Sequence, residues 1–314
     1  MRIAVAGGGY LATMLVKAVM NSNHELVALV QDARRYRGIK RYLAPILGAV
    51  FFPTREVSGM ALRNRIPLIY IDKMTDAELE PLRRIKPDLL LVGGFAIILK
   101  KLLLDLPSIG CVNCHSSLLP KHRGPNPFTA VILAGERETG VTFHVVAEGI
   151  DTGDILKQYV IPITDMDTAG SIHRRASDLA GEKVPELLAY IEEHGLKGEV
   201  QDGSAASYDK RLKPAELYID WTLSAEEIER KVRACFPFTS ARLRHQGRTV
   251  YLSRVQLSRK HIEAQPGEVI ENMPRLKVAT GSGVITVEIA YTLRPVPWFW
   301  PRLSRRPRIG ERLG

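Results

Sequence analysis

The first thirty residues constrain the fold most. An apolar stretch at Ile3–Ala6 is followed by the glycines at 7–9, by helical apolar spacing over Leu11–Met20 and by a second apolar stretch at Leu26–Val30. A buried strand, a glycine turn, a helix and another strand form one parallel α/β unit. The glycines also resemble a dinucleotide-binding turn, with Asp32 after the second strand, but Ala12 stands where the third glycine is usual. Both interpretations stay open.

The same alternation continues through the first 200 residues. Further strands are expected at 66–71, 89–92, 109–114, 141–146 and 155–161, and helices at 76–86, 127–134 and 171–193. Strands that alternate with helices in this way favour a doubly wound, mostly parallel, Rossmann-like sheet. We therefore predict a catalytic domain at residues 1–200.

A change in sequence character marks a second domain. Residues 201–207 are small and polar, as in a linker. Ser224-x-x-Glu227 is a capping box that begins a helix ending near Cys235. Short strands are expected beyond it at 239–245, 249–257, 268–271, 277–280 and 284–290. This spacing predicts a small, OB-like β-barrel domain at 208–314.

The composition of the chain limits the classes of partner that it is expected to bind. The chain of 314 residues has a net charge of +10 and a pI near 9.6, which favours an anionic partner such as nucleic acid, a phosphorylated substrate or an anionic membrane surface; a generally basic surface is the alternative. Three cysteines form no disulfide framework, so a cytoplasmic location is expected. Cys111 and Cys114 fit small buried apolar residues better than a redox or zinc pair. We find no secretory signal and no apolar run of about 20 residues.

Polar residues gather where the strand at 109–114 ends. Asn113 and His115 are two residues apart, so their side chains point to the same side. An Asn amide donates two hydrogens, and a His moves protons near neutral pH. Asp151 follows in a second polar turn at 148–154. Together they would form a proton-transfer site that needs no metal, whereas taken singly each is more typical of a structural histidine or of a turn.

Several motifs in fixed order resemble the 10-formyltetrahydrofolate-dependent formyltransferases. They are Asn113-x-His115-x-Ser117-Leu118-Leu119-Pro120, Arg123-Gly124, Gly140-Val141-Thr142 and Asp151-Thr152-Gly153-Asp154. The resemblance implies transfer of a formyl group from 10-formyltetrahydrofolate to an amine. Asn113 would donate to the oxyanion, His115 would donate to it or move the proton, and Asp151 would orient His115. It also implies a folate site built from Ala96, Ile97, Ile98, Ser117, Leu118, Leu119, Pro120, Ala147, Glu148, Gly149 and Ile150.

The sequence constrains the identity of the formyl acceptor less than that of the formyl donor. Arg34, Arg35, Arg37, Lys40 and Arg41 form a basic segment beside Tyr36 and Tyr42. It resembles in place and charge the tRNA-binding loop of the methionyl-tRNA formyltransferases, the branch whose two-domain layout this chain shares, so initiator methionyl-tRNA is the expected partner. A solvated helix start leading into a packed amphipathic segment is the alternative. The apolar residues 42–53 and the aromatic, arginine-rich residues 291–308 depart from that branch.

Other acceptors and activities stay open. In some sugar-nucleotide formyltransferases an Arg stands shortly after the Arg-Gly pair, where this chain has Pro125. An amino-sugar nucleotide, another small amine, or water in a formyl-folate hydrolase are the alternative acceptors. A relative that binds folate or RNA without turnover is the alternative from another functional class, and the presence of Asn113, His115 and Asp151 argues against it.

Overall fold

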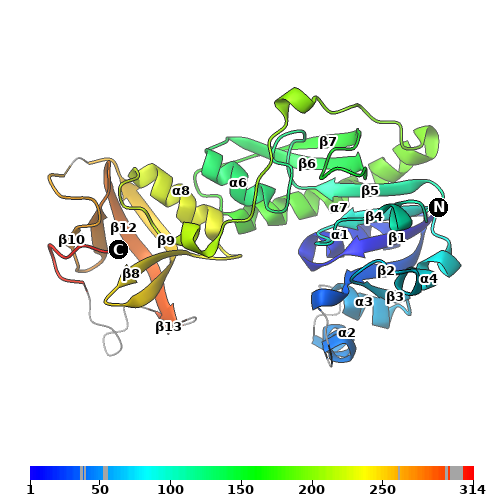
Figure 1. Ribbon diagram of the computed structural model, residues 1–314, viewed down its shortest axis with the longest axis horizontal. Coiled ribbons are helices and arrows are strands. Elements are labelled where there is room, and N and C mark those ends of the chain that lie inside the picture. The colour runs from blue at the N-terminus through cyan, green and yellow to red at the C-terminus, as the bar shows by residue number, and fades with distance from the viewer. Residues whose placement is uncertain (36–37, 39, 52–55, 261, 294–295, 298–306) are drawn as a thin grey trace. The chain divides into compact units, whose positions relative to one another are not determined.

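A computed structural model describes residues 1–35, 38, 40–51, 56–260, 262–293, 296–297 and 307–314 (Figure 1). The chain divides into two compact units. The first unit comprises Met1–Pro127, Glu138–Pro162 and His173–Asp209, and the second comprises Phe128–Arg137, Ile163–Ile172 and Lys210–Gly314. Residues 201–207, predicted to be a linker, are thus part of the first unit. Within the described residues, no helix combines the length and the apolar character that crossing a membrane requires.

A seven-stranded sheet forms the centre of the first unit. Its strands are β1 (Arg2–Gly7), β2 (Glu25–Asp32), β3 (Leu68–Ile71), β4 (Leu89–Gly93), β5 (Gly110–His115), β6 (Glu138–Val145) and β7 (Ile155–Pro162), in the order β3-β2-β1-β4-β5-β6-β7. The first five strands in this order pair in parallel, and β6 and β7 extend the sheet in antiparallel pairing. The predicted doubly wound, mostly parallel sheet is confirmed.

Helices cover both faces of this sheet. α1 (Gly9–Met20), α3 (Val57–Arg63) and the part of α7 (Ala169–His194) in the first unit share one core, which includes Leu15, Leu91 and Phe143. α4 (Asp76–Ile85) and the short α5 (Lys101–Leu104) contribute Leu79, Leu82 and Leu103 to the core on the other face. Alternate strand residues point to opposite faces, so β4 supplies Leu91 to one core and Leu90 to the other.

The glycine turn after β1 packs against the chain itself. A Cβ on Gly7 would lie 1.9 Å from the carbonyl oxygen of Gly93, and one on Gly94 would lie 2.9 Å from the carbonyl oxygen of Gly8. Gly7 and Gly93 are also partners in the pairing of β1 with β4. The close approach of these two backbones accounts for the glycines without a bound dinucleotide.

A short 3-10 helix, Ala33–Arg35, follows β2 and leads towards α2 (Lys40–Phe51). Gly48 of α2 lies on Gly59 of α3, where an added Cβ would meet backbone atoms of the other helix. The large apolar side chains of α2 are exposed instead of packed: Tyr42, Leu43, Ile46, Leu47, Val50 and Phe51. The packed amphipathic segment considered as an alternative is therefore not what the described part of this helix forms.

The second unit is built on an antiparallel sheet. Its strands are β8 (Ala241–His245), β9 (Arg248–Ser258), β10 (Val269–Glu271), β11 (Leu276–Ala279) and β12 (Val284–Leu293), in the order β10-β11-β12-β9-β8, with β13 (Val296–Pro297) paired to β12. α8 (Ala225–Cys235) begins at the predicted capping box and packs Ile228 and Val232 into the core of the sheet. α6 (Pro127–Ala134) forms a small core with Ile172 and Ala234. Two further 3-10 helices lie at Gly203–Ala205 and Pro214–Leu217.

Candidate active site

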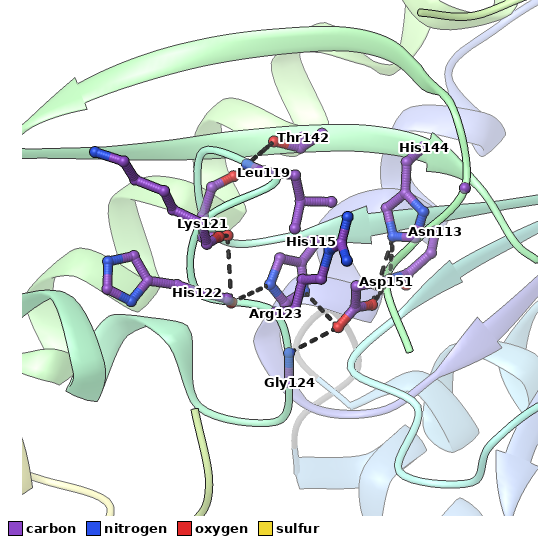
Figure 2. A network of polar contacts seen from close by, with 12 residues as sticks. Asn113, His115, Leu119, Lys121, His122, Arg123, Gly124, Thr142, His144 and Asp151 are labelled. Carbon is purple, nitrogen blue, oxygen red and sulfur yellow. Dashed lines mark hydrogen bonds and ion pairs between the residues drawn. The ribbon is translucent and has the colours of Figure 1, made fainter. Parts of the chain in front are cut away.

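Three elements bring the predicted catalytic residues together (Figure 2). Asn113 and His115 come from the end of β5, and Asp151 comes from the loop between β6 and β7. β6 runs antiparallel to β5, with His144 paired to Asn113 and Thr142 paired to His115. The sheet therefore places a second histidine, which the sequence reasoning missed, beside the predicted group.

Asp151 is the centre of this cluster. Its Oδ2 accepts a hydrogen bond from the main-chain N–H of Gly124 at 2.9 Å and lies 3.7 Å from Nδ1 of His115. Its Oδ1 accepts from Nδ2 of Asn113 at 3.3 Å and lies 3.5 Å from Nε2 of His144. Both carboxylate oxygens thus face polar or cationic partners. The left-handed backbone at Asp151, with φ of 52°, belongs to the polar turn that the sequence predicted.

These contacts keep Asp151 ionised. Asp151 titrates at a low pH, at which the neighbouring imidazoles are protonated. Burial acts to raise its pKa, but the hydrogen bond with protonated His144, the charge of protonated His115 and the Gly124 amide outweigh burial and bring the pKa down to about 2. A permanent negative charge therefore lies beside His115 at neutral pH.

His115 is 7% exposed and has opposite partners at its two ring nitrogens. Nε2 lies 2.9 Å from the carbonyl oxygen of His122, which can only accept, so Nε2 carries a hydrogen. Nδ1 faces Asp151. Burial lowers the pKa of His115, and the charge of Asp151 raises it only in part, so the ring is neutral at pH 7. A neutral ring with hydrogen on Nε2 has its lone pair on Nδ1 and can take up a proton there.

Asn113 directs its amide nitrogen towards both neighbours. Nδ2 lies 3.0 Å from Nε2 of His144 and 3.3 Å from Oδ1 of Asp151. Nδ1 of His144 donates to the carbonyl oxygen of Val145 at 2.8 Å, which leaves Nε2 free to accept from Asn113 in the neutral ring. His144 thus fixes the direction of the predicted oxyanion donor. Its place opposite Asn113 follows from the alternation Thr142-x-His144 only once the antiparallel pairing of β6 with β5 is known.

The motif after β5 divides into buried and accessible parts. Ser117 is buried, and its Oγ donates to the carbonyl oxygen of Lys121 at 2.8 Å. Leu119 is also buried, with its N–H directed to Thr142 and its carbonyl oxygen accepting from Gln158 at 2.9 Å. Leu118 and Pro120 are half-buried. The contacts of Ser117 and Leu119 shape the turn, and the folate-binding role of the four residues stays a prediction.

Two loops next to the cluster present accessible side chains. After β4, Ala96 is exposed and Ile98 is 67% exposed, while Ile97 packs partly into the core. After β6, residues 147–150 are all exposed, and they include the predicted folate-binding residues Ala147, Glu148, Gly149 and Ile150. Exposed apolar side chains beside polar backbone groups suit a flat, partly polar ring system such as a pterin. The folate-binding role of these loops remains a prediction.

The basic segment begins with an arginine that is exposed but bound to neighbouring residues. Arg34 donates to both oxygens of Asp32, at 2.9 and 2.8 Å, and to the carbonyl oxygen of Ala96 at 3.1 Å. It therefore connects the end of β2 with the first of the two accessible loops. Lys40 is exposed at the start of α2. The backbone of Arg35 and Arg41 is described but their side chains are not, and Arg37 lies outside the described residues. A role of these residues in substrate binding stays a prediction.

The segment predicted as a linker makes extensive contacts with the catalytic loops. Nε2 of Gln201 donates to the carbonyl oxygens of Asp151 and Gly153, at 2.9 and 2.7 Å. Arg123 donates to Oε1 of Gln201 and to the hydroxyl of Tyr208 at 2.7 Å. Small polar residues such as those at 201–207 do not reveal such contacts in the sequence. Whether a side chain of this segment reaches the site depends on where its backbone lies, and composition does not encode that position.

The cysteines belong to the core. Burial raises the pKa of Cys111 to about 12 and raises the pKa of Cys114 further, so neither is a thiolate at neutral pH. Both lie in the hydrophobic cores on the faces of β5. In the part of the chain that the structure describes, no group of three or more His, Cys, Asp or Glu side chains is arranged to hold a metal ion. The predicted absence of a metal stays a prediction.

Comparisons with known proteins find matches along most of the chain. The family model described as formyl transferase matches residues 1–188, and the model of the formyl transferase C-terminal domain matches residues 211–292. A methionyl-tRNA formyltransferase of Pseudomonas putida is 33% identical over 289 residues, which is 91% of this chain and 90% of that protein. One from Marinobacter nauticus is 32% identical over 292 residues, 92% of this chain and 91% of that protein.

Solved structures share the fold at lower identity. The N-formyltransferase from Helicobacter canadensis superposes with a TM-score of 0.67 at 19% identity, covering 93% of this chain and all of that one. The methionyl-tRNA formyltransferase from Clostridium thermocellum has a TM-score of 0.55 at 21% identity and covers 84% of this chain and 97% of that one. Because both family models and close relatives span most of the sequence, the chain belongs to the formyl transferase family.

Proposed function

We propose that this protein transfers a formyl group from 10-formyltetrahydrofolate to an amine, and that the amine belongs to methionyl-tRNA. The arrangement of His115 carries the proposal. Its neutral ring directs Nδ1 towards the Asp151 carboxylate, 3.7 Å from Oδ2, while its other nitrogen is held by the His122 carbonyl. This is a proton acceptor with a permanent negative charge beside it, which is what attack by an amine requires.

The donor supplies an electrophilic formyl carbon, whose oxygen gains negative charge as the amine attacks. Asn113 is the amide donor at the site, and one of its two hydrogens would turn from Asp151 or His144 to that oxygen. Removing one such donor from an enzyme costs about 3–4 kcal/mol in transition-state stabilisation. The attacking nitrogen loses its proton to Nδ1 of His115, and the imidazolium that forms is stabilised by Asp151. The tetrahedral intermediate then collapses with cleavage of the bond between the formyl carbon and the donor nitrogen, and the imidazolium returns the proton to that nitrogen as tetrahydrofolate leaves.

The donor site would use the two accessible loops. Ala96, Ile98 and Ile150 would cover the ring system, and free backbone groups in the same loops would bond to its polar edge. Arg34 holds the first loop through the carbonyl oxygen of Ala96. With the ring system bound by these loops, the formyl carbon would lie near Asn113 and His115.

The tRNA acceptor is supported by two observations. The relatives named methionyl-tRNA formyltransferase align with both units at 32–33% identity. The net charge of +10 provides the attraction that phosphates need. One observation favours a small acceptor such as an amino-sugar nucleotide: Arg34, in the segment expected to bind tRNA, is engaged by Asp32, and the helix that follows exposes apolar side chains.

A substrate comparison distinguishes these acceptors. Purified protein is given 10-formyltetrahydrofolate with charged initiator methionyl-tRNA, with amino-sugar nucleotides, or with no acceptor, and release of tetrahydrofolate is followed. We expect turnover only with the tRNA. Faster turnover with an amino-sugar nucleotide than with the tRNA would identify that nucleotide as the acceptor. Turnover without any acceptor at the same rate as with the tRNA would indicate a hydrolase.

Salt dependence tests the tRNA contact itself. Replacing Arg35, Arg37 and Arg41 with Ala, while keeping Arg34 for its contact with Ala96, should raise KM for tRNA and flatten its dependence on salt. Each lost phosphate contact lowers the slope of log K against log salt by about 0.7–0.9. A variant that removes the exposed Lys73, Arg84 and Lys197 provides the charge-matched control. Equal behaviour of the two variants would exclude the basic segment from tRNA binding.

A further inference from the structure

His122 lies next to the catalytic histidine but directs its main chain, not its ring, towards it. Its backbone is left-handed, with φ of 57°, and the residue is 7% exposed. In this conformation its carbonyl oxygen accepts from Nε2 of His115 at 2.9 Å and from Oγ of Ser117 at 3.4 Å (Figure 2). Left-handed backbone is uncommon for residues other than glycine, although histidine, like asparagine and aspartate, adopts it more often than most, so contacts with neighbouring residues help to hold it.

The segment that ends the first unit supplies those contacts. Nδ1 of His122 lies 2.7 Å from Oδ2 of Asp209, and the His122 N–H donates to Oγ of Ser207 at 2.8 Å. The next residue is tied on both sides, because Arg123 N–H donates to the carbonyl of Ser207 and Asp209 N–H donates to the carbonyl of Arg123, each at 2.9 Å. Of these contacts, the one between His122 and Asp209 joins two side chains.

The position of the His122 carbonyl decides which nitrogen of His115 carries the hydrogen. A carbonyl only accepts, so it retains the hydrogen on Nε2 and leaves the lone pair on Nδ1. The opposite nitrogen faces Asp151, whose carboxylate would favour a hydrogen on Nδ1. The titratable groups that face the ring are Asp151, His144 and His122. Loss of the carbonyl would therefore allow the other tautomer, with its lone pair turned away from Asp151.

We infer that His122 and Asp209 are positioning residues for the catalytic base: their pairing holds the His122 carbonyl where it selects the Nε2-protonated tautomer of His115. The catalytic meaning of this selection rests on the proposed formyl transfer, whereas the tautomer itself does not. The pair also connects the base to the residue that immediately precedes the second unit. Gln201 holds the Asp151 loop from the same segment, so both partners of the proton transfer are fixed by it.

The tautomer can be measured without any substrate. In protein with ¹⁵N-labelled histidine, two-bond nitrogen–proton spectra distinguish hydrogen on Nε2 from hydrogen on Nδ1, and His115→Gln identifies the signal. We expect the wild-type His115 to carry its hydrogen on Nε2. Asp209→Ala and His122→Gly, the second of which tolerates left-handed backbone, should both give a mixture of the two tautomers. Asp209→Asn retains an acceptor oxygen for Nδ1 of His122 and should restore the wild-type signal.

Kinetics on the same variants separate positioning from folding. In Asp209→Ala and His122→Gly, kcat should fall as the Nε2-protonated fraction falls, by at most the roughly 10²–10⁴-fold that a general base contributes, with KM for the donor unchanged. Asp202→Ala, which removes an exposed turn carboxylate in the same segment, is the matched control and should change neither measurement.

The outcomes that overturn the inference are distinct from failure of the proposed function. If both variants keep the wild-type tautomer while folded, or if kcat falls with the tautomer unchanged, the pair does not position His115. Should Asp209→Ala unfold, Asp209→Asn and His122→Gly still decide the question. If the wild type shows the Nε2-protonated ring but no formyl transfer, the proposed function fails and the tautomer selection stands.

Discussion

The end of β5 and the helix α2 are opposites in how the chain holds its side chains. At the end of β5, Asn113, His115 and Asp151 are each held by at least two polar contacts, and His115 is nearly excluded from solvent. Along α2 the large side chains are apolar and exposed, and Gly48 is the residue that packs. The side chains at the end of β5 are therefore fixed by contacts within the first unit. The outward face of α2, in contrast, is not packed against any described part of that unit.

The two regions also differ in how their side chains contribute to the free energy of folding. A buried carboxylate is tolerated only with partners, and Asp151 has them, as its pKa of about 2 indicates. Exposed apolar side chains add little to folding, because the hydrophobic effect requires removal from water. A contiguous exposed apolar face is instead typical of a surface that contacts something else. Changes at the end of β5 should therefore affect chemistry strongly, and changes on α2 should leave chemistry and stability nearly intact.

The largest effect is expected from His115→Ala. Loss of the proton acceptor should reduce kcat for formyl transfer by about 10²–10⁴-fold, since a positioned general base contributes that much. Single-turnover measurement of the formylated acceptor is the direct assay, with circular dichroism to confirm folding. His194→Ala, which removes an exposed histidine, is the control. Turnover within a factor of two of the wild type would exclude His115 as the base.

A second, smaller effect concerns pH. The base must be neutral, and the pKa of His115 lies below its ordinary value of 6.5, so kcat should be full at neutral pH and fall as the pH drops through that lowered pKa. The charge of Asp151 is what partly raises it. Asp151→Asn removes that charge, so the pKa should fall further and the acid limb should move to lower pH, with a lower maximal rate.

The pH profile of kcat from pH 4 to 9 in both proteins measures this shift. Asp154→Asn, which removes the other carboxylate of the same motif, serves as the control. If the acid limb of the Asp151→Asn profile stays where it is in the wild type, or moves to higher pH, then Asp151 does not act on His115 in the way the geometry indicates.

The sequence predicted that Asn113, His115 and Asp151 lie together, which the structure shows, but it predicted their surroundings poorly, for a physical reason. Asn113, His115 and Asp151 could be placed because β5 is short and buried and because the polar turn around Asp151 is written in local residues. His144 depends on the pairing of β5 with β6. Asp209 reaches His122 across 87 positions, through a segment whose composition is that of a linker. Contacts set by long-range backbone placement leave no local pattern in a single sequence.

The same distinction applies to the fold. Apolar periodicity predicted the parallel strands, and the motif Ser224-x-x-Glu227 predicted the capping box, since both are local signals. The exposed apolar face of α2 contradicts the usual meaning of that periodicity, in which an apolar stripe faces a core. Periodicity reports that a face is apolar and does not report what covers it.

The contact of α2 with α3 gives a third prediction. A Cβ on Gly59 would lie 2.3 Å from the carbonyl carbon of Gly48, so Gly59→Ala must push the helices apart. Overpacking of this kind costs about 1–3 kcal/mol in the free energy of unfolding. Urea denaturation measures it against Gly203→Ala, where an added Cβ meets nothing within 4 Å. Unchanged stability would show that α2 moves without cost to the rest of the unit.

The smallest effect is expected on the outward face of α2. Leu47 and Val50 are 49% and 66% exposed, so Leu47→Ser and Val50→Ser should each change the free energy of unfolding by no more than about 0.5 kcal/mol. Val19→Ser provides the contrast, because Val19 is fully buried in α1 and loses both burial and packing. Urea denaturation of dilute protein is the measurement. A loss above about 1.5 kcal/mol at Leu47 or Val50 would mean that something covers this face in the native protein. Repeating the denaturation over a hundredfold range of protein concentration would then show whether a second copy covers it, since only association makes stability depend on concentration.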